Sequence, residues 1–267
     1  MQATVYSFKL QAYLPVMKNV FNYGIDKLTV EGTIAITSGK IKAVINDEAV
    51  KKINASLKHV QNIVASKKTV YGVNTGFGIL ANSPISEEDT ATLQYKILQS
   101  HSVGVGDPIP AEVAKLMMIT KVHALAQGYS GVQLSTLERI VWHIENNVIP
   151  VVPEKGSVGA SGDLAPLAHL FLPLIGLGEC FYKGERKNTA AIFQKEKIKP
   201  IQLGPKEGLA LINGTQFILS FSVKAVQRMH NCLEAADIIG AMSLEALTGT
   251  KAPFDERLHD LRPFAGN

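Results

Sequence analysis

The stretch Gly156-Ser157-Val158-Gly159-Ala160-Ser161-Gly162-Asp163-Leu164-Ala165-Pro166-Leu167-Ala168-His169 begins as a glycine-rich loop and continues as an apolar run. Its glycines permit backbone conformations and close approaches that a Cβ atom would prevent. Asp163 stands where such a loop would pass into a helix, as an N-cap or a first-turn acid. The apolar residues from Leu164 to Leu174 predict that this helix is buried. We therefore expect a loop at the positive end of a buried helix, which suits chemistry on an electron-rich group.

The size and composition of the chain are those of a globular protein. It has 267 residues, of which 46% are hydrophobic and 19% charged, enough for a sizeable core. The net charge of +4 is spread among interspersed acids and bases, which argues against a nucleic-acid partner. Cys180 and Cys232 form no CxxC pair, so neither a disulfide framework nor a zinc site is indicated. This cysteine usage fits a reducing compartment, and we expect a cytoplasmic location.

The N-terminal segment carries no targeting signal that we can identify. Met1 to Val16 lacks a basic segment followed by an apolar one, and Met17 is an alternative start. The most apolar stretch, Leu164 to Leu177, contains two prolines and a glycine. It is shorter than the ~20 apolar residues of a membrane span, so we expect no membrane partner.

Periodicity and breaker residues predict a mostly helical chain. Short strands are expected at Leu28–Val30 and Thr33–Ile36, and a hairpin around Gly184 at Glu179–Asn188. Helices are expected from Asp47 to about Ser66, from Ser86–Asp89 to Ser100–His101, over Ala111–Gln127 and over Gln133–Asn146. Val148–Pro153 is expected to be extended, and Lys251–Arg257 irregular.

A helix of roughly 30 residues is predicted to start at a cap formed by Asn213 or Thr215 and to end near Leu247. Its apolar residues occur on several faces rather than along one stripe. Such a helix is buried in a bundle or between subunits.

The run Gly159–Ala168 resembles the signature of the aromatic amino-acid ammonia-lyases, which comprise histidine, phenylalanine and tyrosine ammonia-lyases and related aminomutases. The resemblance extends to Tyr71–Gly78, Leu98–His101 and Leu211–Gln216, and covers the chain from about Leu28 onwards. It implies a mainly α, ammonia-lyase/fumarase-like fold. In this fold an N-terminal α+β region carries the active-site loops and leads into the long helices of a central bundle.

The family makes its electrophile from its own backbone. By resemblance, the amide nitrogen of Gly162 attacks the carbonyl of Ala160, and two dehydrations give a methylidene-imidazolone (MIO). Glycine has no Cβ to block ring closure, and Ser161 can lose its hydroxyl to leave the exocyclic methylene. The reaction needs this electrophile, because elimination of ammonia requires removing a weakly acidic proton from the β-carbon of the amino-acid substrate. A protein base near pH 7 cannot remove that proton unaided. No external cofactor is expected.

The resemblance also implies roles for other residues. Tyr71 is the base, although a tyrosine with a pKa of ~10 needs positive potential nearby to act at neutral pH. Asn213 contacts the electrophile and the substrate, and Gly78 and Gln216 belong to the same site. Taken alone, the glycine pattern of residues 156–162 is more often a phosphate loop or a plain turn, but no Gly-Lys-Ser/Thr ending follows.

The pair Ser100-His101 bears on the substrate. Histidine lyases carry Ser-His at this place, tyrosine lyases His and an aliphatic residue, and phenylalanine lyases an apolar pair. The resemblance therefore implies L-histidine as the substrate and trans-urocanate and ammonia as the products. A tyrosine or phenylalanine lyase or an aminomutase is the alternative. The other histidines lack metal-ligand spacing, so no metal is expected.

The expected organisation has three parts: a lead-in at residues 1–26, the active-site region with the electrophile loop at 27–213, and the start of the central bundle at 214–267. The family forms homotetramers whose active sites combine several subunits, and its carboxylate-binding arginine lies beyond the matched residues. We therefore also consider an inactive N-terminal fragment, which would be prone to oligomerise.

Overall fold

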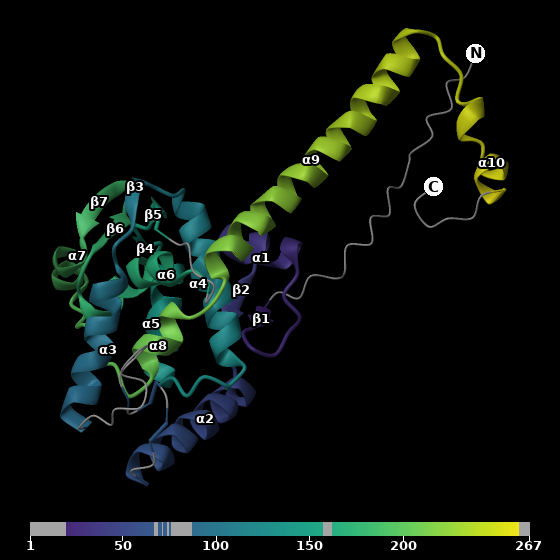
Figure 1. The fold of residues 1–267 in the computed structure, drawn as a ribbon. Helices are drawn as coiled ribbons and strands as arrows, with labels where there is room; N and C mark the ends of the chain where they lie inside the picture. The colour runs from purple at the N-terminus through teal and green to yellow at the C-terminus, as the bar shows by residue number, and fades with distance from the viewer. Residues whose placement is uncertain are drawn as a thin grey trace. The chain divides into compact units, whose positions relative to one another are not determined.

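The computed structural model describes residues 20–66, 69–70, 72–73, 75, 87–156 and 162–261, without the side chains of 87–91 (Figure 1). The chain divides into two compact units, which meet in the sequence at Ser222 and Val223. Helices dominate both units, as the sequence predicts.

The first unit packs short helices around α4, with small sheets beside them. Its helices are α1 (Val30–Thr37), α2 (Asp47–Ala65), α3 (Glu87–His101), α4 (Ala111–Ala126), α5 (Leu134–Glu145), α6 (Leu164–Phe171), the 3₁₀ turn η2 (Leu172–Ile175), α7 (Thr189–Glu196) and α8 (Glu207–Ile212). Its strands are β1 (Val20–Asn22), β2 (Lys42–Val44), β3 (Val105–Pro108), β4 (Ile149–Pro150), β5 (Pro153–Lys155), β6 (Glu179–Tyr182) and β7 (Glu185–Asn188).

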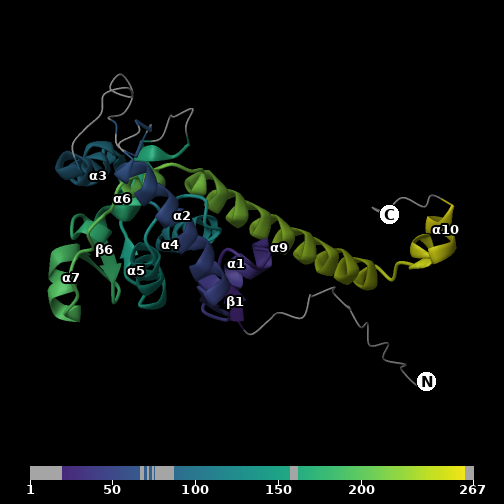
Figure 2. The same ribbon diagram turned by 90° about the horizontal axis from the view of Figure 1, so that it is seen from below.

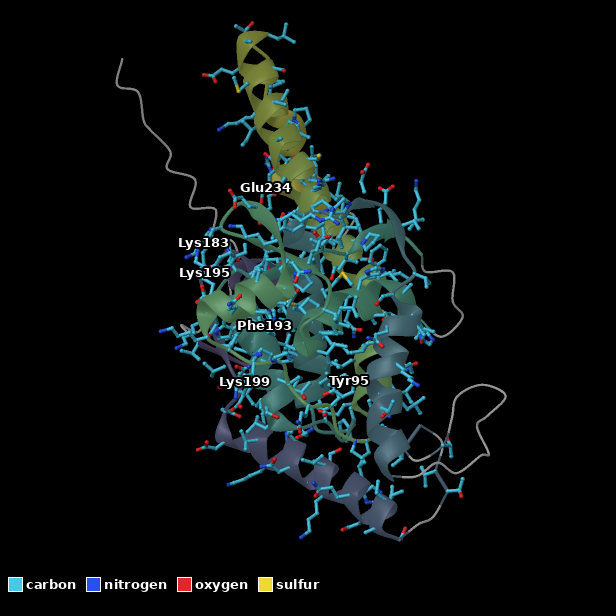
Figure 3. All side chains as sticks on the ribbon, turned by 90° about the vertical axis from the view of Figure 1, so that its left-hand side faces the viewer. Tyr95, Lys183, Phe193, Lys195, Lys199 and Glu234 are labelled. Carbon is cyan, nitrogen blue, oxygen red and sulfur yellow. The ribbon has the colours of Figure 1, made fainter. Side chains whose placement is uncertain are left out.

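The strands form separate small sheets. β1 and β2 pair in parallel, β3 pairs with β5 antiparallel, and β4, β6 and β7 form an antiparallel sheet in that order. Lys183 and Gly184, both with positive φ, form the tight turn of the predicted β6–β7 hairpin. Lys183 in this turn and Lys195 on α7 lie close to each other (Figure 3), and their Nζ atoms are 5.0 Å and 5.5 Å from the ring centroid of Tyr182.

Helix α4 is the centre of the core. Its side chains from Val113 to Ala126 are mostly buried, and α1, α2 and α5 all contact it. Figure 2 shows α2 lying across this layer. Helices α3, α6 and α8 pack against one another in a second cluster of the same unit (Figure 1). The core therefore joins α4 to the elements that carry the quoted motifs.

The second unit contains most of α9 (Gln216–Ala246), the 3₁₀ turn η3 (Ala252–Phe254) and α10 (Glu256–Asp260). The predicted long helix is confirmed, but η3 and α10 replace the irregular stretch expected at Lys251–Arg257. Asp255 explains the start of α10, because its side chain accepts a hydrogen bond from the backbone N–H of Arg257.

The two strands expected at residues 28–36 are wrong, because Val30–Thr37 form the helix α1. Thr29 caps its start by accepting a hydrogen bond from the N–H of Gly32 at 3.1 Å, and Glu31 lies in the first turn. The Thr33 hydroxyl donates to the carbonyl of Thr29 at 2.6 Å. Packing against α4 thus outweighs the β propensity of the branched side chains.

The other predicted helices are confirmed to within a few residues, and the buried helix after the glycine loop is α6. Helix α2 starts at Asp47 as predicted, and the residue before it, Asn46, is its N-cap, since the Asn46 side chain accepts a hydrogen bond from the N–H of Ala49. No described helix combines the length and apolar character that a membrane crossing requires.

Candidate active site

The quoted loop meets the Leu211–Gln216 motif through backbone pairing. Gly162 and Gly214 form an isolated parallel bridge, and the N–H of Asp163 donates to the carbonyl of Gly214 at 2.8 Å. Residues 52 positions apart in the sequence are thereby fixed side by side. The end of the glycine loop is therefore held by the motif that precedes α9.

Position 162 accepts only glycine. Its φ is +104°, a region that residues with a Cβ rarely adopt. A Cβ added there would lie 2.3 Å from the carbonyl oxygen of Gly214, which is backbone and cannot rotate away. The close approach of the two chains thus depends on the missing side chain at Gly162.

Asp163 joins two helices. It occupies the N-cap position of α6, as predicted, but its side chain makes no capping hydrogen bond to that helix. Its Oδ2 instead accepts from the N–H groups of Phe217 at 3.1 Å and Ile218 at 3.2 Å, in the first turn of α9. The start of α9, where a cap by Asn213 or Thr215 was predicted, thus receives a carboxylate from a distant segment, a contact that the helix dipole also favours.

Asn213 and Gln216 flank this pairing. Asn213 is the C-cap of α8 rather than an N-cap, and its side-chain amide donates to the carbonyl of Leu209 at 2.9 Å. Gln216 is 9% exposed, and its Oε1 is buried without a hydrogen-bond partner among the described residues. A buried amide oxygen of this kind favours a ligand or a covalent group nearby.

A charged residue that the sequence analysis did not single out also reaches this segment. Lys121 on α4 is 2% exposed, and its Nζ donates to the carbonyl oxygen of Asn213 at 2.5 Å. Burial lowers its pKa to about 7. In the sequence, Lys121 stands beside the apolar residues Ile119 and Val122 of the predicted helix, and a lysine in such surroundings is the pattern that could have indicated a buried charge.

The start of α8 carries a second buried charge. Glu207 accepts hydrogen bonds from the backbone N–H of Gln133 at 2.7 Å, from Thr136 Oγ1 at 2.8 Å and from the N–H of Gly204 at 2.6 Å. The buried Gln94 of α3 accepts from the N–H of Gly208 at 2.9 Å. These contacts fix α8 between α3 and α5, and with it the motif that follows.

Ser100 and His101 lie at the end of α3. His101 Nδ1 is 2.9 Å from the carbonyl oxygen of Ile97 and 3.1 Å from Ser100 Oγ. Because a carbonyl only accepts hydrogen bonds, Nδ1 carries the proton in the neutral ring. Nε2 of His101 is then left as an acceptor.

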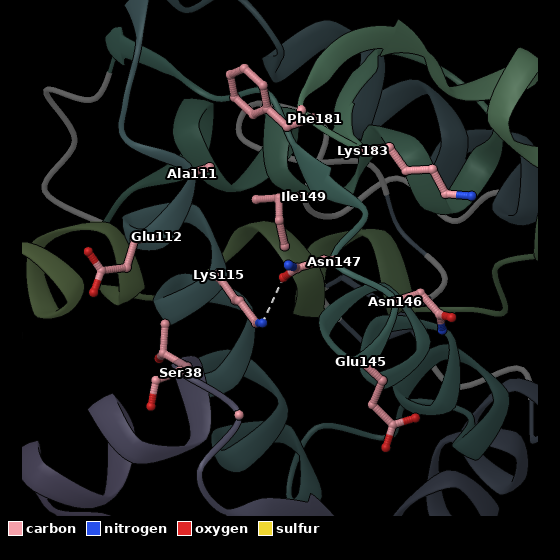
Figure 4. A pocket seen from close by; sticks show the side chains of 13 residues that line it. Ser38, Ala111, Glu112, Lys115, Glu145, Asn146, Asn147, Ile149, Phe181 and Lys183 are labelled. Carbon is pink, nitrogen blue, oxygen red and sulfur yellow. Dashed lines mark hydrogen bonds between the residues drawn. The ribbon is translucent and has the colours of Figure 1, made fainter.

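The remaining predicted site residues, Tyr71, Gly78, Ala160 and Ser161, lie outside the described residues. Among the residues that are described, no cluster of His, Cys, Asp or Glu could hold a metal ion. A cavity of about 710 Å³ lies elsewhere, where Lys115 Nζ donates to Asn147 Oδ1 at 2.8 Å (Figure 4). None of the site residues above lines it.

Backbone pairing joins the glycine loop before the buried helix α6 to the motif before α9, and the loop lacks the Gly-Lys-Ser/Thr ending of a nucleotide loop. The family model for aromatic amino acid lyases matches residues 28–267, and the chain belongs to this family.

Similar proteins agree with this assignment. A histidine ammonia-lyase of Streptococcus pyogenes serotype M3 is 44% identical over 250 residues, which are 94% of this chain and 49% of that protein. The structure of histidine ammonia-lyase from Trypanosoma cruzi matches with a TM-score of 0.84 and 36% identity, over 92% of this chain and 48% of that one. Tyrosine aminomutase from Streptomyces globisporus matches with a TM-score of 0.83 and 32% identity, over 90% and 45%. The chain thus has the ammonia-lyase fold and spans about half the length of these relatives.

Proposed function

We propose that the protein containing this chain is a histidine ammonia-lyase, which eliminates ammonia from L-histidine to give trans-urocanate. The observation that carries the proposal is the Gly162–Gly214 pairing, in which the expected ring nitrogen belongs to a residue that must be glycine. Relatives named histidine ammonia-lyase support the choice within the family.

The described residues fit a methylidene-imidazolone made from Ala160, Ser161 and Gly162. Gly162 lacks the Cβ that would collide with the carbonyl oxygen of Gly214, and Gln216 offers a buried amide oxygen beside Gly214. When formed, the group supplies an electrophile that makes the substrate's amine a better leaving group. The chain's own part is to hold Gly162 at a fixed place through Gly214 and Asp163.

His101 provides a reason to favour histidine. With Nδ1 donating to Ile97, Nε2 of the neutral ring accepts a hydrogen bond from a substrate donor. An imidazole N–H of L-histidine is such a donor, as is the hydroxyl of tyrosine, whereas the ring of phenylalanine offers none. Tyrosine lyase or aminomutase activity is therefore the alternative that must be tested.

The remaining roles are proposed on the family resemblance. Tyr71 removes the β-proton, and Asn213 and Gly78 contact the substrate or the electrophile. Ser100 supports His101, to which its hydroxyl lies close. We further propose that the protein is a cytoplasmic homotetramer with no external cofactor.

Two measurements test the proposal. The intact mass of the chain should be lower than its sequence mass by two water molecules, and Ser161→Ala should abolish this loss while the circular dichroism spectrum stays unchanged. The purified native protein should release urocanate from L-histidine, followed by its absorbance. Release of coumarate from tyrosine or of cinnamate from phenylalanine, without release of urocanate from L-histidine, would show that the substrate assignment is wrong.

A further inference from the structure

Lys121 is a lysine inside an apolar core. It is 2% exposed, and the neighbouring α4 residues Met117, Met118 and Val122 are at most 1% exposed. Removing an ammonium group from water costs several kcal/mol unless a partner compensates. An apolar residue at this place would fill the core without that cost, so the lysine needs a specific explanation.

The contact of Lys121 supplies one. Its Nζ donates to the carbonyl of Asn213 at 2.5 Å, and the next carbonyl in the chain, that of Gly214, accepts from the N–H of Asp163 at 2.8 Å. One peptide unit separates the carbonyl that Lys121 holds from the carbonyl that pairs with the glycine loop. Movement at Asn213 would therefore displace the surface against which Gly162 is placed.

The distribution of buried charge points to the same segment. Among the described side chains, the buried Asp, Glu, Lys and Arg residues are Lys121, Asp163 and Glu207. Lys121 binds Asn213, Asp163 binds Phe217 and Ile218, and Glu207 begins the helix α8 that ends at Ile212. All of them act on residues 207–218, which is typical of a site that must be held rigidly.

We propose that Lys121 is a positioning residue for formation of the electrophile. It clamps the Asn213 carbonyl and so keeps Gly214 where Gly162 meets it. The inference rests on the proposed function, because that function gives Gly162 its role. In the ring closure the Gly162 nitrogen bonds to the Ala160 carbonyl carbon and two waters leave. Lys121 makes and breaks no covalent bond in these steps.

Lys121→Met tests the clamp, because it keeps the length and apolar stem of the side chain but removes the donor. Lys121→Leu is a second neutral variant without a donor, measured alongside in case methionine prevents folding. Lys121→Arg keeps the charge and the donors. Lys115→Met is the matched control, since Lys115 lies on the same helix and donates to Asn147 at the separate cavity (Figure 4). Thermal unfolding shows which variants are folded.

The first readout is amide hydrogen exchange of peptides that contain Asp163 and Phe217. In Lys121→Met and Lys121→Leu their exchange should accelerate about tenfold or more, because a buried carbonyl has lost its donor. Lys115→Met should leave it unchanged, and Lys121→Arg should restore protection. Wild-type exchange in the folded neutral variants would overturn the proposal. So would an arginine variant that behaves like the methionine one, because the loss would then be one of packing.

The second readout is the intact mass of each full chain after a fixed time. The wild type, Lys115→Met and Lys121→Arg should lose two waters, and Lys121→Met should retain them in most molecules. Complete loss in Lys121→Met would overturn a role in ring formation. A wild-type chain that retains both waters would contradict the proposed function instead, while hydrogen exchange would still decide whether Lys121 holds the Gly162–Gly214 pairing.

Discussion

Helices α4 and α9 are both rich in apolar residues, yet they have opposite surroundings. On α4, Leu116 and Met117 are fully buried by other elements of the first unit. On the part of α9 in the second unit, Ile238 is 62% exposed and Met242 is 64% exposed. An apolar pattern on all faces thus predicts that a helix needs cover, but not which chain supplies it. Cover for α9 from another copy or another segment is the natural inference.

The largest expected effect comes from a matched pair of leucine truncations. Leu116→Ala removes a fully buried side chain and should lower the free energy of unfolding by about 2–5 kcal/mol. Leu233→Ala, on α9, removes a side chain that is 59% exposed and should change it by about 0.5 kcal/mol or less. Urea denaturation of the dilute chain measures both. Equal losses would mean that α9 is covered within the chain.

The second prediction concerns Lys121, the buried charged residue of α4. Burial lowers the pKa of Lys121 to about 7, whereas an unfolded lysine has its ordinary pKa of ~10.4. Between these values the unfolded chain binds more protons than the folded one, so this group makes the free energy of unfolding rise with pH. The slope is at most about 1.4 kcal/mol per pH unit, and the contribution is constant below pH 7.

The difference between the wild type and Lys121→Met isolates this contribution from other titrating groups. Urea denaturation at pH values of roughly 8 and 9, which lie near the middle of the window between the two pKa values, should show a steeper rise for the wild type. Parallel pH dependence in the two proteins would mean that the lysine is charged and compensated in the folded state.

Self-association should depend on the exposed face of α9. Ile238→Asp places a carboxylate in any apolar contact that forms there and should weaken association about tenfold or more, because burying an unpaired charge costs several kcal/mol. Ser243→Asp adds the same charge at a polar exposed position of the same helix and is the control. Sedimentation velocity at several concentrations measures the effect. If both variants associate like the wild type, another surface is responsible.

The structural features that could be predicted are those that depend on residues close together in the sequence. Helix α5 was expected at Gln133–Asn146 and is found at Leu134–Glu145, because its apolar residues follow the helical period. The hairpin at Glu179–Asn188 could be predicted because Gly184 stands between two short strand-like runs. Helix α1 was missed because branched residues favour strands locally, while packing on α4 decides the outcome.

The candidate site divides in the same way. Local motifs alone single out Gly162, Asn213 and Gln216, whose roles stay predictions, and the structure pairs Gly162 with Gly214. The contacts of Asp163 with Phe217 and of Lys121 with Asn213 could not, since they join residues 54 and 92 positions apart. Only the packed fold brings such residues together, and neither partner carries a local signal for the other.

The smallest effect, one of reactivity rather than stability, compares the two cysteines. Cys180 is fully buried, and burial raises its thiol pKa to about 12, so it should resist modification in the folded chain. Cys232 is exposed on α9 and should react promptly with a thiol reagent. Native labelling should therefore modify one thiol, and labelling in denaturant both.

The concentration dependence of that labelling sharpens the comparison of the two helices. If copies of the chain cover α9, modification of Cys232 should slow as the chain is concentrated, because only the dissociated form exposes the thiol. Ile238→Asp should remove this dependence, and Ser243→Asp should retain it. The opposite outcome is a chain that associates in sedimentation while the labelling of Cys232 stays independent of concentration. The contact between copies would then lie away from Cys232, and another segment would have to cover α9.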